Sequence, residues 1–138
     1  MNLRLIESHK IDAFWDKIED RIRSSLEVDN EYYASPHEIH SSLLLGERQL
    51  WIANEESDKN TIFVTKILLL NYRKTFIFEI CEGGEINWEQ LLTQFIDYAQ
   101  EQGCTKLMIM GRRGWKRVLS SYDFKETSVI LTKDIERG

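Results

Sequence analysis

The stretch TFIFEICEGGEINWEQLLTQFIDYAQEQGCTKLMIM, residues 75–110, decides how this chain folds. Its pattern predicts a strand, a loop, an amphipathic helix and a second strand, at Thr75–Cys81, Glu82–Ile86, Asn87–Gln102 and Lys106–Met110. Two strands joined through a helix of this length are expected to lie parallel and side by side. Ligands of such units bind beyond the carboxyl ends of the strands, where the following helix presents free N–H groups. The sequence therefore places a candidate site around Cys81–Ile86, with a second wall at Gly111–Gly114.

Capping residues support the helices on which this interpretation depends. Asn87 with Gln90 forms a capping pair before the central helix, and Gly103 is placed to end it. Upstream, Ser35 with Glu38 forms a capping box that predicts a short helix over 36–45. The apolar residues of the first helix recur at helical spacing, as expected of a helix that packs on a core: Ile11, Phe14, Trp15, Ile18, Ile22 and Leu26.

The remaining segments predict an antiparallel first half, a turn and helix over Gly111–Phe124, and one more strand. The expected strands outside the central stretch are Asn2–Ile6, Gln49–Asn54, Thr61–Leu70 and a last one that begins at Thr127 and contains SVILT. The four-residue loop NYRK predicts a hairpin into the strand that starts at Thr75. Strict alternation along that strand would put Phe76, Phe78 and Ile80 on one face and Ile77, Glu79 and Cys81 on the other. We expect a single α+β domain over residues 1–138 with a mixed, twisted sheet.

Composition narrows the class of protein. The chain has 138 residues, 42% of them hydrophobic and 30% charged, which is typical of a soluble globular domain. A net charge of −5 argues against general attraction to nucleic acid or to an anionic membrane. Neither a signal peptide nor a run of transmembrane length is visible. Cys81 and Cys104 flank a helix roughly 24 Å long, so we expect free thiols and a cytoplasmic location.

The order of elements resembles the GNAT superfamily of acetyl-CoA-dependent N-acetyltransferases. The likeness is carried by GRRGWKRVLSSYDFKETSVILTKDI, residues 111–135, in which Asp123-Phe124-Lys125-Glu126 is similar to the family's turn before its final strand. Gly111–Trp115 and LLLGERQLWIA (residues 43–53) look like segments of short GNAT-like proteins encoded by tailed bacteriophages. That resemblance implies the host cytoplasm, or a virion, as the location.

The resemblance implies a binding notch for acetyl-CoA. In the family the two parallel strands splay apart, and the pantetheine arm bonds to backbone that corresponds here to Ile80, Cys81 and Glu82. The pyrophosphate would rest on the helix that begins near Asn87, with Gly83 and Gly84 allowing close approach and Arg112 and Arg113 contacting phosphate. The loop departs from the family's pattern, because Glu82 and Glu85 carry charges that repel a pyrophosphate.

The resemblance also suggests catalytic roles. Glu79 is a candidate general base for the attacking amine, although a lone Glu on a strand is more often structural. The family's thiolate-protonating Tyr aligns with Leu119, so Tyr122, three residues further on, is the candidate acid. Acceptor specificity would lie in the Val28–Ser35 loop, which carries Tyr32 and Tyr33.

A second hypothesis is that the fold is kept and the chemistry is lost. Arg112, Arg113, Lys116 and Arg117 surround Trp115, and Arg with Trp are common interface anchors. This cluster would contact a cofactor phosphate, a phage or host protein, or only solvent. In the protein-contact case the chain is an inactive phage accessory or virion-associated protein. His37 and His40 share a helix face but lack further ligands at a supporting spacing, so no metal is expected.

Overall fold

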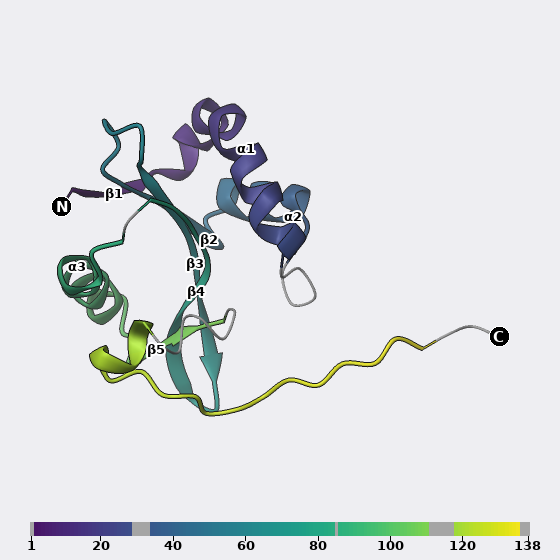
Figure 1. The fold of residues 1–138 in the computed structure, drawn as a ribbon, viewed down its shortest axis with the longest axis vertical. Helices are drawn as coiled ribbons and strands as arrows, with labels where there is room; N and C mark the ends of the chain where they lie inside the picture. Colours follow the sequence, from purple (N-terminus) through teal and green to yellow (C-terminus); the bar gives the residue numbers. More distant parts are fainter. Residues whose placement is uncertain (1, 29–33, 85, 111–117, 136–138) are drawn as a thin grey trace.

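A computed structural model describes residues 2–28, 34–84, 86–110 and 118–135. Its strands are β1 Leu3–Ile6, β2 Arg48–Ala53, β3 Thr61–Leu70, β4 Arg73–Gly83 and β5 Lys106–Ile109. Its α-helices are α1 Ile11–Val28, α2 Pro36–Leu44 and α3 Trp88–Glu101 (Figure 1). Short 3₁₀ turns precede α1 at Ser8–Lys10 and follow β5 at Ser120–Tyr122.

The strands form one mixed sheet in the order β1-β2-β3-β4-β5. The first four strands pair antiparallel in sequence, and β5 pairs parallel to β4, as the sequence predicts. The β3–β4 hairpin closes through Asn71 and Tyr72, whose φ angles of 49° and 63° are those of a tight turn that follows the twist of the strands. The α+β class and the antiparallel-then-parallel sheet are therefore confirmed.

Two apolar clusters hold helices on opposite faces of the sheet (Figure 1). On one face, α1 and α2 pack on the sheet through residues that include Ile22, Ile39 and Ile62. On the other face, α3 covers an aromatic cluster in which the Phe95 ring meets those of Trp51, Phe63 and Phe78 at 4.9–5.1 Å between centroids, edge to face. The amphipathic helices predicted from spacing thus bury the stripes that the sequence marks.

The expected helix ends are present. The Ser35 side chain accepts the N–H of Glu38 at 3.2 Å before α2, and Asn87 accepts the N–H of Gln90 at 3.3 Å before α3. Gly103 follows α3 with φ +83°, a left-handed conformation that ends the helix. No helix in the described part of the chain is both long enough and apolar enough to cross a membrane.

The prediction of strict alternation along β4 is wrong, because the strand contains a bulge. Thr65 of β3 lies opposite Phe78, but Val64 lies opposite Ile80, which leaves Glu79 as an extra residue. The two faces exchange at this point. Phe78 packs with α3, whereas Ile80 packs with α1 and α2 and Cys81 contacts the α3 cluster.

The predicted last strand is absent from the described residues. Residues 124–135 run extended and belong to none of the five strands, and the apolar side chains that follow the half-buried Phe124 are exposed. The preceding turn does form: Asp123 has φ +67°, and the N–H of Phe124 donates to the Leu119 oxygen at 3.4 Å. The chain leaves the domain at this turn and does not return to the sheet (Figure 1). Of the helix predicted over 111–124, residues 111–117 lie outside the described ranges.

Gly83 is required by the close approach of two strands. A Cβ at Gly83 would lie 2.5 Å from the Asn60 oxygen, and its φ is +142°. We expect Gly83→Ala to lower the free energy of unfolding by about 3 kcal/mol, from steric overlap added to backbone strain. Urea unfolding measures the loss.

Gly103→Ala is the matched control for this prediction. Its φ of +83° imposes strain, but the nearest atom to an added Cβ is 3.8 Å away. We expect a loss of only about 1–2 kcal/mol there. Equal losses at the two positions would contradict the overlap at Gly83.

Candidate active site at the end of β4

The described pairing of β4 with β5 ends at the position where a site is expected. Their parallel register ends with Phe78 opposite Ile109, after which the N–H of Met110 donates to the Phe78 oxygen at 3.3 Å. β4 continues for five more residues, Glu79–Gly83, for which the described residues supply strand partners on β3 alone. The backbone of Ile80, Cys81 and Glu82, predicted to hold a pantetheine arm, lies in this part of β4.

The two glycines at the end of β4 are required by the packing of the chain itself. Gly83 pairs with Thr61 at the start of β3, and a Cβ at Gly84 would lie 2.9 Å from the Lys59 oxygen. Close approach of the chain to itself therefore explains both residues without any ligand.

Glu82 does not present an isolated charge to the loop. Its carboxylate forms a salt bridge with Arg21 of α1, and both side chains are about one-third exposed. The same guanidinium donates to the Asn60 side chain and backbone oxygen, and to the Glu82 backbone oxygen at 3.3 Å. Arg21 thus ties α1 to the open end of the β3–β4 hairpin and offsets the charge that the sequence analysis treated as repulsive. Glu85 lies outside the described residues.

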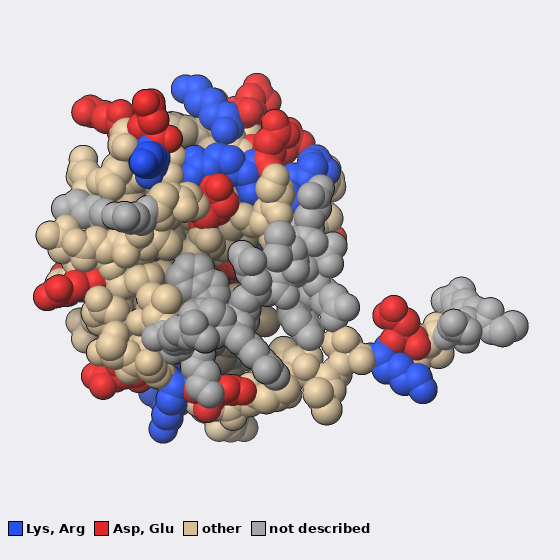
Figure 2. Space-filling model, viewed as in Figure 1, with Lys and Arg blue, Asp and Glu red and all other residues tan. Residues whose placement is uncertain are grey.

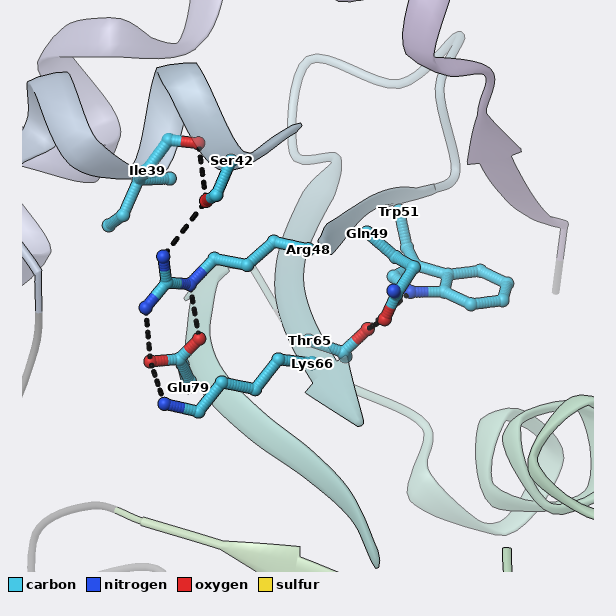
Figure 3. Close-up of polar contacts among 8 residues, drawn as sticks. All are labelled: Ile39, Ser42, Arg48, Gln49, Trp51, Thr65, Lys66 and Glu79. Carbon is cyan, nitrogen blue, oxygen red and sulfur yellow. Dashed lines mark hydrogen bonds and ion pairs between the residues drawn. The ribbon is translucent and has the colours of Figure 1, made fainter. Parts of the chain in front are cut away.

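Glu79, the bulged residue, sits in a buried ion-pair network (Figure 3). Its side chain is 2% exposed, and its oxygens lie 2.7 Å from Arg48 Nε and 3.3 Å from Lys66 Nζ. Arg48 also donates to the Ser42 hydroxyl of α2 at 2.8 Å, and Ser42 donates to the Ile39 oxygen. The network therefore connects the bulge to α2.

Sequence analysis missed Arg48 and Lys66 as partners of Glu79. They are opposite one another on β2 and β3, an arrangement that two like charges disfavour unless an anion lies between them. The signal that could have found them is a pair of cations beside apolar runs: Arg48 comes one residue before the strand predicted at Gln49–Asn54, and Lys66 lies within the one predicted at Thr61–Leu70. The pairing could not be predicted because of the bulge: regular alternation along β4 does not specify the face on which the Glu79 side chain lies.

A second polar chain crosses β2 and β3 beside this network (Figure 3). Trp51 Nε1 donates to the Thr65 hydroxyl at 2.9 Å, and that hydroxyl donates to Gln49 Oε1 at 2.9 Å. Thr65 is fully buried, and it is also the β3 residue at which the register shifts. Polar groups on both sides of the bulge are therefore satisfied within the protein.

Cys81 and Cys104 are both free thiols. Burial raises the pKa of the Cys81 thiol far above its usual range, which keeps the sulfur protonated. Burial also raises the pKa of Cys104, against a smaller lowering by Lys74. A protonated thiol is a poor nucleophile, so Cys81 contributes backbone to this region and no reactive sulfur.

Leu119, which occupies the position of the family's Tyr, and Tyr122, the candidate acid, have different surroundings. Leu119 is 1% exposed and packs in the α3 cluster. Tyr122 is 37% exposed on the 3₁₀ turn Ser120–Tyr122. Only Tyr122 therefore offers a hydroxyl to solvent or to a ligand.

The basic cluster lies outside the described residues, as does part of the acceptor loop. These residues are Arg112, Arg113, Trp115, Lys116, Arg117, Tyr32 and Tyr33. Of the two histidines weighed for metal binding, His40 instead joins α2 to α1: its ring stacks on Trp15 at 4.3 Å and lies 2.8 Å from Asp12. Among the described residues, no three His, Cys, Asp or Glu side chains gather as a metal site would require.

Comparison with solved structures identifies the fold. A predicted acetyltransferase from Clostridium acetobutylicum, solved with acetyl-CoA, superposes with a TM-score of 0.66 at 14% identity, over 96% of this chain and 95% of that one. The chain has the GNAT acetyltransferase fold. An aminoglycoside acetyltransferase, meta-AAC0020, from an uncultured soil metagenomic sample and in complex with sisomicin, gives 0.65 at 10% identity, over 98% and 96%.

A third solved structure, named for a different activity, is somewhat less similar. The ribosomal-protein-alanine N-acetyltransferase from Brucella melitensis biovar Abortus 2308 gives a TM-score of 0.60 at 11% identity, over the whole of both chains. No protein-family model matches the sequence, and no curated protein does. The fold expected from the resemblance is thus supported by structure, and the likeness to phage proteins stays a prediction.

Removal of the Glu79 charge leaves Arg48 and Lys66 buried without their anion. We expect Glu79→Gln to lower the free energy of unfolding by about 3 kcal/mol, because a half-broken buried ion pair retains its desolvation cost. Glu55→Gln is the matched control: Glu55 pairs with Arg4 at 2.9 Å, but both side chains are more than one-third exposed. That change should cost less than about 1 kcal/mol. Urea unfolding of both variants checks the contrast, and a Glu79→Gln loss no larger than the control would contradict it.

Proposed function

We propose that this protein is an N-acyltransferase that takes an acetyl group from acetyl-CoA in the notch where β4 leaves β5. The observation that carries the proposal is the bulge at Glu79 together with the end of β4–β5 pairing one residue before it. These two features leave one edge of the β4 backbone beside the carboxyl end of β5, within a fold shared with acetyltransferases. Backbone N–H and C=O groups at such an edge suit the amide groups of a pantetheine arm.

The cofactor would lie along the end of β4 and reach the start of α3. Ile80, Cys81 and Glu82 would bond the pantetheine through their backbone, and the loop at Gly83 and Gly84 would pass beneath the pyrophosphate. The first N–H groups of α3, after Asn87, would bind phosphate oxygens with help from the helix dipole. The salt bridge of Glu82 with Arg21 supports this placement because it offsets a charge next to the phosphates. Arg112 and Arg113 would supply positive charge from the β5 side.

The chemistry would be direct transfer. The acceptor amine attacks the thioester carbonyl carbon, so that a C–N bond forms and the C–S bond to CoA breaks. Backbone N–H groups near Cys81 would hold the oxyanion, Glu79 would take the amine proton through a water molecule, and Tyr122 would protonate the departing thiolate. The ion pairs with Arg48 and Lys66 support the role of Glu79 only by fixing where its carboxylate lies.

The fold gives little information on which class of amine accepts the acetyl group. Two GNAT-fold neighbours are named for an aminoglycoside and for the alanine of a ribosomal protein, which share a primary amine. We infer a primary amine here, selected by the loop that carries Tyr32 and Tyr33. The contrasting hypothesis, an inactive phage accessory protein, depends on Trp115 and its basic neighbours, and the binding test below separates the two.

Acetyl-CoA should bind as a one-to-one complex and raise the melting temperature by mass action. Asn87→Asp keeps a capping oxygen but adds a negative charge where the pyrophosphate would rest. We expect about fivefold to tenfold weaker binding by calorimetry, the effect of about 1 kcal/mol of repulsion. Gln100→Glu adds the same charge near the other end of α3 and should leave the affinity unchanged. No thermal shift at millimolar acetyl-CoA would exclude the enzyme and favour the accessory protein.

Tyr122→Phe should reduce turnover about 100-fold and leave acetyl-CoA affinity intact, because only the proton donor is lost. Turnover is measured as release of the CoA thiol with a panel of primary amines, including an aminoglycoside and a peptide with a free N-terminal alanine. Tyr72→Phe, on a ring that is 94% exposed at the β3–β4 turn, is the control and should be silent. An active Tyr122→Phe enzyme would remove Tyr122 from the mechanism without affecting the cofactor site.

A further inference from the structure

The outer edge of β5 is an open strand edge within the described part of the chain. β5 is the last strand of the sheet, and its inner edge pairs with β4. Because the N–H of Met110 points to Phe78 on β4, and backbone groups alternate sides along a strand, the N–H and C=O groups of Leu107 and Ile109 point to the outer edge. All four β5 side chains are only half-buried, so the last strand is incompletely covered as well as unpaired on one side.

The C-terminal segment has strand composition but no strand partner among the described residues. Residues 127–131 read TSVIL, rich in β-branched residues, and run extended without belonging to any strand. Val129, Ile130 and Leu131 are 68%, 54% and 90% exposed. A free strand of this composition and an open sheet edge are each aggregation hazards when left apart.

The position at which this segment leaves the domain favours pairing with a second chain. Phe124 is anchored by its bond to Leu119 and by its packing in the α3 cluster. Only two residues separate it from Thr127, and from there the chain projects away from the body of the molecule (Figures 1 and 2). A chain that extends outward can lay its strand on the β5 edge of a neighbour, while its own β5 edge receives the neighbour's strand. Such an exchange is two-fold symmetric and closed, so that the β5 edge of each copy is paired.

We propose that this protein is a strand-exchanged homodimer, in which residues 127–131 of each copy extend the sheet of the other along β5. The contact adds a sixth strand to each sheet and covers Val129 and Leu131 on one face and Ile130 on the opposite face. The proposal is independent of catalysis. It also places the exchanged strand next to the end of β5, and so beside the wall of the notch.

The test uses the full chain and measures its mass by light scattering over a range of concentrations. The expected mass is about twice the 16.4 kDa of one chain. Ile130→Pro removes a backbone N–H from the middle of the exchanged strand and should return the mass to that of one chain. Ile135→Pro, at a still more exposed position beyond the strand, is the control and should remain dimeric.

Hydrogen exchange of the wild-type chain supplies a second readout that does not depend on any variant. The amides of residues 127–131 should be protected in the dimer and lose that protection on dilution into the monomer. A monomer at all concentrations overturns the proposal, whether the segment is exposed or protected on its own β5. A dimer that survives Ile130→Pro also overturns it.

Discussion

The extra residue in β4 is the constraint on which the rest of this structure depends. A bulge at Glu79 exchanges the faces of the strand: Phe76 and Phe78 pack under α3 before it, whereas after it Cys81 contacts that cluster and Ile80 packs with α1 and α2. Parallel pairing with β5 stops one residue before the bulge. A bulge increases the local twist and bends its strand. The candidate site therefore lies at an irregular part of β4.

Polar side chains stabilise this irregular region from the α1–α2 face. Glu79 is enclosed by Arg48 and Lys66, and through Arg48 it reaches α2. Arg21 of α1 performs a similar role at the end of the hairpin, where it contacts Glu82 and Asn60. The Arg21–Glu82 ion pair and the Arg48–Ser42 hydrogen bond thus each connect a helix to the irregular part of the sheet. Apolar packing holds the remainder of the sheet, which contains the aromatic cluster around Phe95.

The fold of this protein does not by itself determine its chemistry. Similarity to acetyltransferases at 10–14% identity identifies the architecture, because sheet order and helix placement are shared over nearly the whole chain. Function depends on sites that are added to an architecture. Here the proposed cofactor contacts are mostly backbone, which many sequences can provide, so the proposal does not depend on a particular loop sequence.

Local patterns in the sequence determined most of the elements. Period-two and helical spacing, the caps at Ser35 and Asn87 and the stop at Gly103 placed the helices and strands to within two residues, and the helix between two apolar runs specified a parallel pair. Tertiary structure alone decided the rest. No local pattern signals the bulge at Glu79, because whether a strand holds an extra residue depends on its neighbour's register. The ion pairs of Glu79 and Arg21 join residues 31 and 61 positions apart in the chain, and the segment after Thr127 has strand composition but can become a strand only where an edge is within reach.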